Sequence, residues 1–134
     1  YGRSDTTLNP GGVRLGTSEI YSEVEKFKEI KESIVIGQSW DNDIRIILFV
    51  TMNKNHKLNN KLIKRIKKQI RTNASPRHVP SKILNVNDIP RTKNGKIVEL
   101  AVKNIVEGNK VKNKEALANP EILKDFKNIK ELKY

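Results

Sequence analysis

Two kinds of apolar pattern divide the first half of the chain into elements. Between residues 18 and 30, apolar residues recur at helical spacing with charged residues between them, which predicts an amphipathic helix that ends near Ile30. Two runs rich in β-branched residues follow, 33–40 and 44–52, and the Asp-Asn-Asp sequence between them is typical of a tight turn. We therefore expect the two runs to pair as a hairpin, with the second run central in a sheet.

The same signals predict four further elements. Asn59 or Asn60 can cap a second helix, which has isoleucines and leucines on one face and lysines and arginines on the other. Residues 82–88 alternate apolar with polar side chains, as a third strand does. Residues 97–107 read as a third helix, and Asn119 is expected to cap a last one.

The order of these elements indicates the fold class. Near the start of the chain an Asn-Pro-Gly-Gly turn joins two short strands, around 7–8 and 13–15, into a small hairpin. The chain of 134 residues has the length of a single domain. We expect an α+β domain, in which a small β-hairpin is followed by a three-stranded mixed or antiparallel sheet flanked by helices.

The distribution of charge gives evidence about binding partners that the apolar pattern does not give. The formal net charge is +12, and the whole excess lies in residues 54–114, which hold seventeen Lys or Arg against three Asp or Glu. This excess suggests an anionic partner such as nucleic acid, a phosphorylated cofactor or an acidic surface. A compositional bias that places lysines on a solvated face is the alternative.

Other functions are excluded by composition. The absence of Cys excludes a disulfide framework, a thiol nucleophile and a zinc knuckle, and two histidines are too few for a His-rich metal site. We expect His56 and His78 on surface loops, and Trp40 and Phe49 in the core. The longest apolar run, 46–50, is far too short to cross a membrane and no signal peptide is visible, so we expect a cytoplasmic protein.

Three groups of residues can carry chemistry. The first is the basic turn 90–96, where Lys96 follows a glycine. It is not a phosphate-binding P-loop, because Pro90 and Ile97 stand where that motif needs Gly and Ser or Thr. The turn is either an ordinary solvated connection or a rigid support that presents an ammonium group to a phosphate or carboxylate.

The second and third groups are also basic. Arg3 and Arg14 flank a glycine-rich turn that lets backbone approach a ligand closely. The basic face of the second helix, including Arg71, is either solvated or lines a phosphate site or a nucleic-acid groove. No aromatic residue lies between Val50 and Phe126, so this basic segment lacks stacking platforms for single strands.

Taken together, these motifs resemble a known family. The C-terminal domain of the adenylate-forming acyl-CoA synthetases is similar in the order and spacing of four of them, up to about Leu100. They are Gly2-Arg3-Ser4-Asp5, Gly12-Val13-Arg14-Leu15-Gly16-Thr17, Ile34-Val35-Ile36-Gly37, and Pro90 with Gly95-Lys96-Ile97. Four segments, 9–14, 73–80, 95–102 and 112–121, resemble the acetoacetate-specific members more closely.

The resemblance implies a two-step ligase that uses ATP and CoA. A large N-terminal adenylation domain, absent from this chain, would hold ATP with Mg²⁺ and the acyl group, so this fragment alone is not expected to be active. Lys96 matches the lysine that assists adenylation, and Asp5 matches the hinge about which the domain turns. Arg3 and Arg14 match residues that contact the nucleotide.

The resemblance also implies a CoA site and a division of the chain. Gly12 matches a glycine that lines the pantetheine tunnel, and Arg71 matches an arginine near the CoA phosphates. The division is a hinge segment 1–6, a mobile C-terminal domain 7–107, and an extension 108–134 with a short helix.

Three positions depart from the pattern of many relatives. Thr6 stands where a second acid follows the hinge, Asn94 where a serine is common, and Glu99 where an arginine is common. None of these changes affects the charge expected of Lys96.

Other functions stay open at this point. The chain can belong to an acetyl- or propionyl-specific ligase, because the acyl pocket lies in the missing domain. In a different class, it can be a basic nucleic-acid-binding module, which would bind strands with a steep salt dependence. A third possibility is a regulatory domain that binds a partner synthetase.

Overall fold

The computed structural model describes residues 7–8, 10, 14–93, 99–109, 117–127 and 129–133, and the structural statements below concern these residues. Among them, no helix is both long enough and apolar enough to cross a lipid bilayer.

The centre of the fold is a three-stranded mixed sheet in the order β3-β4-β5. Its strands are β3 (Ile30–Trp40), β4 (Asp43–Met52) and β5 (Lys82–Asn85). β3 and β4 pair antiparallel through a turn at Asp41 and Asn42, which both have positive φ and are residue types that tolerate it. β5 returns parallel to β4 after the connection that contains α2. A separate two-stranded sheet, β1 (Thr7–Leu8) and β2 (Leu15–Gly16), is antiparallel. The predicted α+β class is confirmed.

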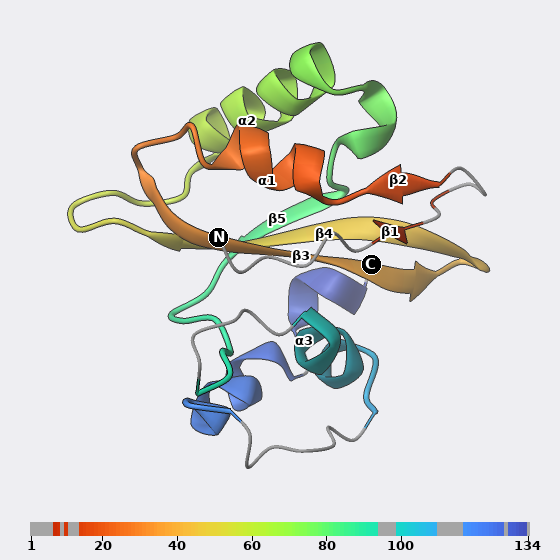
Figure 1. The fold of residues 1–134 in the computed structure, drawn as a ribbon, viewed down its shortest axis with the longest axis vertical. Coiled ribbons are helices and arrows are strands. Elements are labelled where there is room, and N and C mark those ends of the chain that lie inside the picture. The colour runs from red at the N-terminus through yellow and green to blue at the C-terminus, as the bar shows by residue number, and fades with distance from the viewer. Residues whose placement is uncertain are drawn as a thin grey trace.

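Helices cover both faces of the sheet (Figure 1). On one face lie α1 (Ser18–Val24) and α2 (Asn60–Asn73), and on the other lie α3 (Glu99–Val106) and the 3₁₀ turns η4 (Pro120–Phe126) and η5 (Lys130–Lys133). Asn59 caps α2 as predicted, because its side chain accepts a hydrogen bond from the N–H of Leu62.

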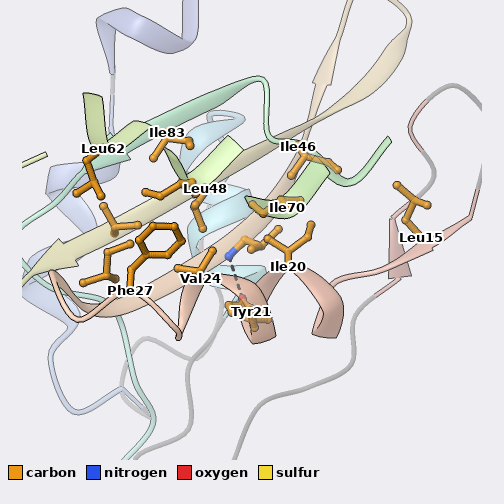
Figure 2. Close-up of a cluster of buried hydrophobic side chains, with 14 residues drawn as sticks. Leu15, Ile20, Tyr21, Val24, Phe27, Ile46, Leu48, Leu62, Ile70 and Ile83 are labelled. Atoms are coloured by element: carbon orange, nitrogen blue, oxygen red, sulfur yellow. Dashed lines mark hydrogen bonds between the residues drawn. The ribbon is translucent and has the colours of Figure 1, made fainter. Parts of the chain in front are cut away.

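Two apolar cores result, one on each face. Ile46, Leu48 and Val50 of β4 belong to the core beneath α1 and α2, which Figure 2 shows, whereas Ile47 and Phe49 belong to the core beneath α3. Successive side chains of a strand point to opposite faces. The stretch 46–50 of β4 is apolar without interruption because it is buried on both sides.

The described residues after Gly108 that carry buried apolar side chains close the second core. Leu117, Leu123, Phe126 and Leu132 are all buried there, and the ring of Phe126 packs edge-on against Phe49 with 5.0 Å between centroids. These apolar side chains pack in one cluster with those of α3, so residues 117–127 and 129–132 form part of the core.

Two predicted boundaries were wrong. The first helix ends at Val24, not near Ile30, because the N–H groups of Lys26 and Phe27 bond carbonyls three residues back and Ile30 already pairs with β4. The third strand ends at Asn85, not at 88, because its pairing with β4 stops there.

The expectations for two ring side chains were also wrong. His78 is buried at 8% exposure, because its two ring nitrogens contact Ser75 and Glu19. Trp40 is only half-buried at the end of β3, where the guanidinium of Arg45 stacks over its ring at 3.9 Å. Phe49 is fully buried and His56 is exposed, which confirms both predictions.

Candidate functional site

The sequence-predicted site residues fall into two groups. Arg14 and Arg71 are described by the structure, whereas Arg3, Asp5, Gly12 and Lys96 lie outside the described residues. Arg14 is exposed directly before β2, and Arg71 is exposed in the last turn of α2. Within the described part of the chain, neither arginine has an ion pair with a carboxylate, so both cations face solvent.

The hairpin beside Arg14 is held to the sheet at Gly37. A Cβ atom built on Gly37 would lie 2.9 Å from Cγ2 of Ile44 and 3.0 Å from Cδ2 of Leu8. A side chain at this position would force the side chains of Ile44 and Leu8 to shift. The glycine in the Ile34–Gly37 motif therefore permits the close contact between the hairpin and the sheet.

The basic face predicted for the second helix exists and is largely free of counterions. Four of its cations are exposed and have no ion pair among the described residues: Lys61, Lys64, Lys68 and Arg71. Arg65 differs, because it donates to Glu29 at 2.8 Å and lies over the ring of Phe27 at 5.4 Å. The hydrogen bond from Arg65 holds the pKa of Glu29 below its ordinary value.

A shallow groove runs beside this face. It lies between α2 and the segment that follows α1. Two adjoining hollows of about 260 and 380 Å³ share Phe27, Arg65 and Gln69 in their walls. Lys26, Lys28 and Lys68 also line the groove, whereas Glu29 is the single acidic residue in its described walls. Such an excess of cations around a concave surface attracts phosphate groups.

Glu23 holds the two helices beside the groove together. Its carboxylate accepts hydrogen bonds from Lys26, Gln69 and Asn73, and the residue is 8% exposed. The hydrogen bond from Asn73 is the main reason that the pKa of Glu23 lies below its ordinary value, since it outweighs the opposing effect of burial. Glu23 is therefore ionised at neutral pH and fixes α1 against α2.

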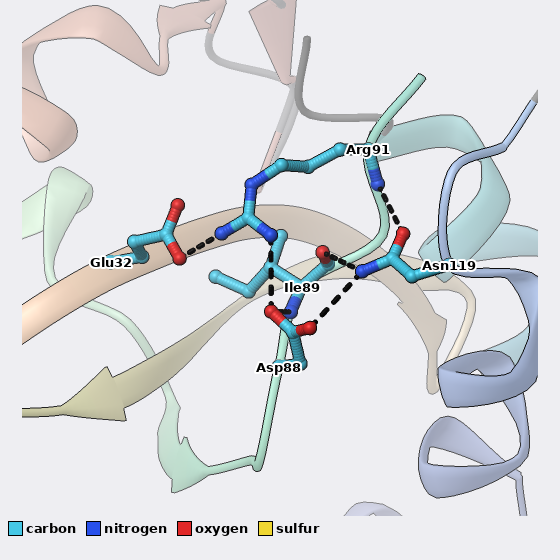
Figure 3. A network of polar contacts seen from close by, with 5 residues as sticks. All are labelled: Glu32, Asp88, Ile89, Arg91 and Asn119. Carbon is cyan, nitrogen blue, oxygen red and sulfur yellow. Dashed lines mark hydrogen bonds and ion pairs between the residues drawn. The ribbon is translucent and has the colours of Figure 1, made fainter. Parts of the chain in front are cut away.

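On the N-terminal side of the Lys96 segment lies a polar cluster, shown in Figure 3. The guanidinium of Arg91 is ion-paired with Glu32 of β3 and with Asp88, the latter at 3.1 Å. Asn119 accepts from the N–H of Arg91 at 3.0 Å and donates to the carboxylate of Asp88 at 3.2 Å and to the carbonyl of Ile89 at 3.0 Å. Arg91 is thus tied to the sheet and to the C-terminal segment, and it is not a free cation of the basic turn.

On the C-terminal side of the Lys96 segment, α3 begins at Glu99. The hydroxyl of Tyr21 donates to Glu99 at 2.6 Å and accepts from the N–H of Val35 at 2.8 Å. Tyr21 is buried, and its bond to the backbone of β3 is visible in Figure 2. Glu99, which departs from the family pattern, therefore anchors the start of α3 to α1 and β3.

Two further side chains bind the same open edge of β3, one from α3 and one from the residue that follows it. Lys103 donates to the carbonyl of Gly37 at 2.9 Å, and Glu107 accepts from the N–H of Ser39 at 2.8 Å. Burial raises the pKa of Glu107, but the bonds from Ser39 and Lys103 outweigh it and hold the pKa below its ordinary value. These contacts satisfy backbone groups of an edge strand and fix α3 along it.

Sequence reasoning missed the Arg91 cluster and assigned Asn119 wrongly. Asn119 does not cap the following turn, because its amide is used by Asp88, Ile89 and Arg91, about 30 residues earlier. The residue type and the following Pro120 indicate a cap, and no local signal indicates the distant partners. For Glu99 the sequence did offer a signal of a special role, because glutamate stands where many relatives have arginine.

Comparison with known proteins identifies relatives along the whole chain. Residues 19–96 match the family described as AMP-binding enzyme C-terminal domain. The chain is 59% identical over 133 residues to the acetoacetyl-coenzyme A synthetase of Rhizobium meliloti (strain 1021), and 51% identical over 132 residues to the acetoacetyl-CoA synthetase of Gallus gallus. These alignments cover 99% and 98% of this chain and 20% of each relative.

A solved structure agrees. The acetoacetyl-CoA synthetase from Streptomyces lividans matches 99% of this chain with a TM-score of 0.83 and 38% sequence identity, over 20% of its own length. The chain thus spans about a fifth of the length of the relatives it matches.

Proposed function

Because the chain belongs to the family of AMP-binding enzyme C-terminal domains, we propose that it is the C-terminal domain of an acetoacetate–CoA ligase. The observation that carries the proposal is the sequence agreement with acetoacetyl-CoA synthetases over nearly the whole chain. The family match ends at Lys96, the residue to which we assign adenylation. The partner of this domain is the large N-terminal domain of the same enzyme.

The proposed reaction has two steps. The carboxylate oxygen of acetoacetate attacks the α-phosphorus of ATP and expels diphosphate, and the thiol of CoA then attacks the acyl carbon and expels AMP. The ammonium of Lys96 bridges the carboxylate and the α-phosphate in the first step. There it offsets the negative charge that grows in the transition state.

Rotation of the domain about Asp5 brings a second face to the reaction for the thioester step. Arg3 and Arg14 contact the ribose and phosphates of the nucleotide, and Gly12 lines the path of the pantetheine arm. Arg14 supports this assignment because it is exposed and without a carboxylate partner among the described residues.

The CoA phosphates are assigned to the basic face of α2. Arg71 lies on the same helical stripe as Lys64 and Lys68, and the adjoining groove is lined by further cations. This donor set fits a ligand with several phosphates. The described residues include no group of three or more His, Cys, Asp or Glu arranged to hold a metal ion, and we assign the Mg²⁺ that accompanies ATP to the N-terminal domain.

The test separates the two half-reactions in the complete enzyme. Lys96→Ala should lower acetoacetate-dependent exchange of pyrophosphate into ATP at least 100-fold, a loss typical of removing one charge-stabilising group. Formation of acetoacetyl-CoA from supplied acetoacetyl adenylate should stay within about twofold, because Lys96 acts only in the first step. Lys93→Ala is the matched control, since Lys93 is exposed in the same basic turn.

Three results would count against the proposal. If Lys96→Ala leaves both half-reactions intact, the role of Lys96 is wrong. If the complete enzyme prefers acetate or propionate to acetoacetate, the acyl specificity is wrong while the ligase assignment stands. Salt-sensitive binding of nucleic acid without any CoA binding would favour the nucleic-acid module instead.

A further inference from the structure

We infer that Asn119 is a positioning residue for adenylation, because it fixes Arg91 and thereby one end of the segment that carries Lys96. The inference rests on the proposed role of Lys96. It gives a residue of the C-terminal extension a part in the chemistry, although Asn119 is 23 positions away from Lys96 in the sequence.

Asn119 uses its amide group on a single short stretch of backbone. The amide oxygen accepts from the N–H of Arg91, and the amide nitrogen donates both to the carboxylate of Asp88 and to the carbonyl of Ile89. An asparagine amide offers two donor hydrogens, and both are occupied here. A side chain used in this way selects one conformation of residues 88–91.

The support behind Asn119 is firm. The N–H of Ala118 donates to the carbonyl of Arg91 at 2.8 Å, and Leu117 forms a β-bridge with Thr92. Leu117 is 6% exposed and Ile89 is fully buried, and both residues belong to the second core. Asn119 therefore holds the start of the basic turn in a fixed position relative to the second core.

The guanidinium of Arg91 adds a second reference point. Its ion pairs with Glu32 and Asp88 tie it to β3 and to the preceding residues (Figure 3). A guanidinium engaged with two carboxylates is a poor ligand for a phosphate, since its charge is already balanced. We therefore assign Arg91 to orientation of the turn and not to substrate binding.

Described residues on both sides of Lys96 are held by side-chain contacts. Lys96 follows Arg91 by five residues and precedes Glu99 by three, and Glu99 is held by Tyr21. Loss of Asn119 would loosen the first attachment and leave the second in place. Stabilisation of a transition state by a charged group requires placement to within a fraction of an ångström, so a loosened attachment lowers the adenylation rate before it lowers stability.

The experiment uses the complete enzyme and the variant Asn119→Ala. The rate of acetoacetate-dependent pyrophosphate–ATP exchange should fall 10- to 100-fold through kcat, with the KM for ATP within about twofold. Thioester formation from supplied acetoacetyl adenylate should also stay within about twofold. Asn109→Ala is the matched control, because Asn109 is exposed after α3, and both half-reactions should be unchanged in it.

A second variant and a second measurement keep the test decisive. Asn119→Ser keeps a hydroxyl that can bond one of the three groups and adds no charge beside Asp88, so its adenylation loss should be smaller than that of Asn119→Ala. Hydrogen exchange at the amides of Arg91 and Thr92 should be faster in Asn119→Ala than in the parent enzyme. If Asn119→Ala does not fold at the assay temperature, the split between half-reactions is measured in Asn119→Ser.

The outcomes separate this inference from the proposed function. Equal loss in both half-reactions, or no loss beyond that of Asn109→Ala, overturns the positioning role of Asn119. If Lys96→Ala leaves pyrophosphate exchange intact, the proposed function fails, and with it the link from Asn119 to adenylation. Unchanged amide exchange at Arg91 in Asn119→Ala overturns the anchoring contact itself.

Discussion

Replacement of Phe126 by alanine tests whether the C-terminal segment is part of the core. Phe126 is fully buried, and its ring packs edge-on against that of Phe49 with centroids 5.0 Å apart. Truncation of a buried Phe to Ala costs about 3–5 kcal/mol, including the cavity that it leaves. Loss of the ring pair accounts for about 0.5–1.5 kcal/mol within that range.

The expected cost is large for a chain of this size. Domains are commonly stable by about 5–15 kcal/mol, so Phe126→Ala should remove a large fraction of the total. For a chain of this length, each kcal/mol lowers the midpoint of thermal unfolding by about 3–4 °C, so we expect a fall of about 9–20 °C. The assays are thermal unfolding followed by circular dichroism and urea unfolding at 25 °C.

The matched control is Leu100→Ala, since Leu100 is 65% exposed on α3 and its truncation should cost less than about 0.5 kcal/mol. If Phe126→Ala costs no more than Leu100→Ala, the segment around Phe126 does not contribute to the core. A change in the urea m-value would show instead that the variant alters the compactness of the folded or unfolded state.

Two further substitutions test the contacts on either side of α1. Glu23→Gln should cost about 1 kcal/mol at pH 7, because the carboxylate loses charge-assisted bonds such as that from Asn73. The folded-state pKa of Glu23 lies below the ordinary value of 4.5, so its stabilisation is present above pH 4.5 and is lost as the pH falls through the folded-state pKa. Urea unfolding at pH 7, 5, 4 and 3 should therefore show the difference from the parent shrinking with acidity, and a constant difference would contradict the assignment. Tyr21→Phe should cost about 1–3 kcal/mol, because the buried N–H of Val35 loses its acceptor and Glu99 loses a donor; an unchanged thermal midpoint would show that the hydroxyl is dispensable.

Much of the fold was predictable because its signals are local. The β-branched run of β4, the turn at Asp41 and Asn42, and the Asn59 cap of α2 each depend on residues close together in the sequence. The boundary at Val24 was not predictable in this way. Phe27 continues the helical spacing beyond it, but pairing of Ile30 with β4 ends the helix first.

The site shows the same division. The order of the motifs identifies the family, and the charge pattern locates the basic face that includes Arg71 on one helix. The roles of Lys96 and Asp5 stay predictions, since both residues lie outside the described part of the chain. Arg91 looked like one more cation of a basic turn, but its two carboxylate partners come from β3 and from the preceding residues.

Composition, spacing and local turn chemistry thus establish the class of the fold, the family and the basic helix, because each is a property of neighbouring residues. The tertiary structure decides which charged side chains have a partner of opposite charge and which face solvent. Ion pairs and side-chain hydrogen bonds form between groups that packing brings together, and the packing of two cores on one sheet is non-local. Asn119 is hydrogen-bonded to Arg91, 28 positions away in the sequence, and Tyr21 to Glu99, 78 positions away. No periodic pattern in the sequence predicts contacts between residues so far apart.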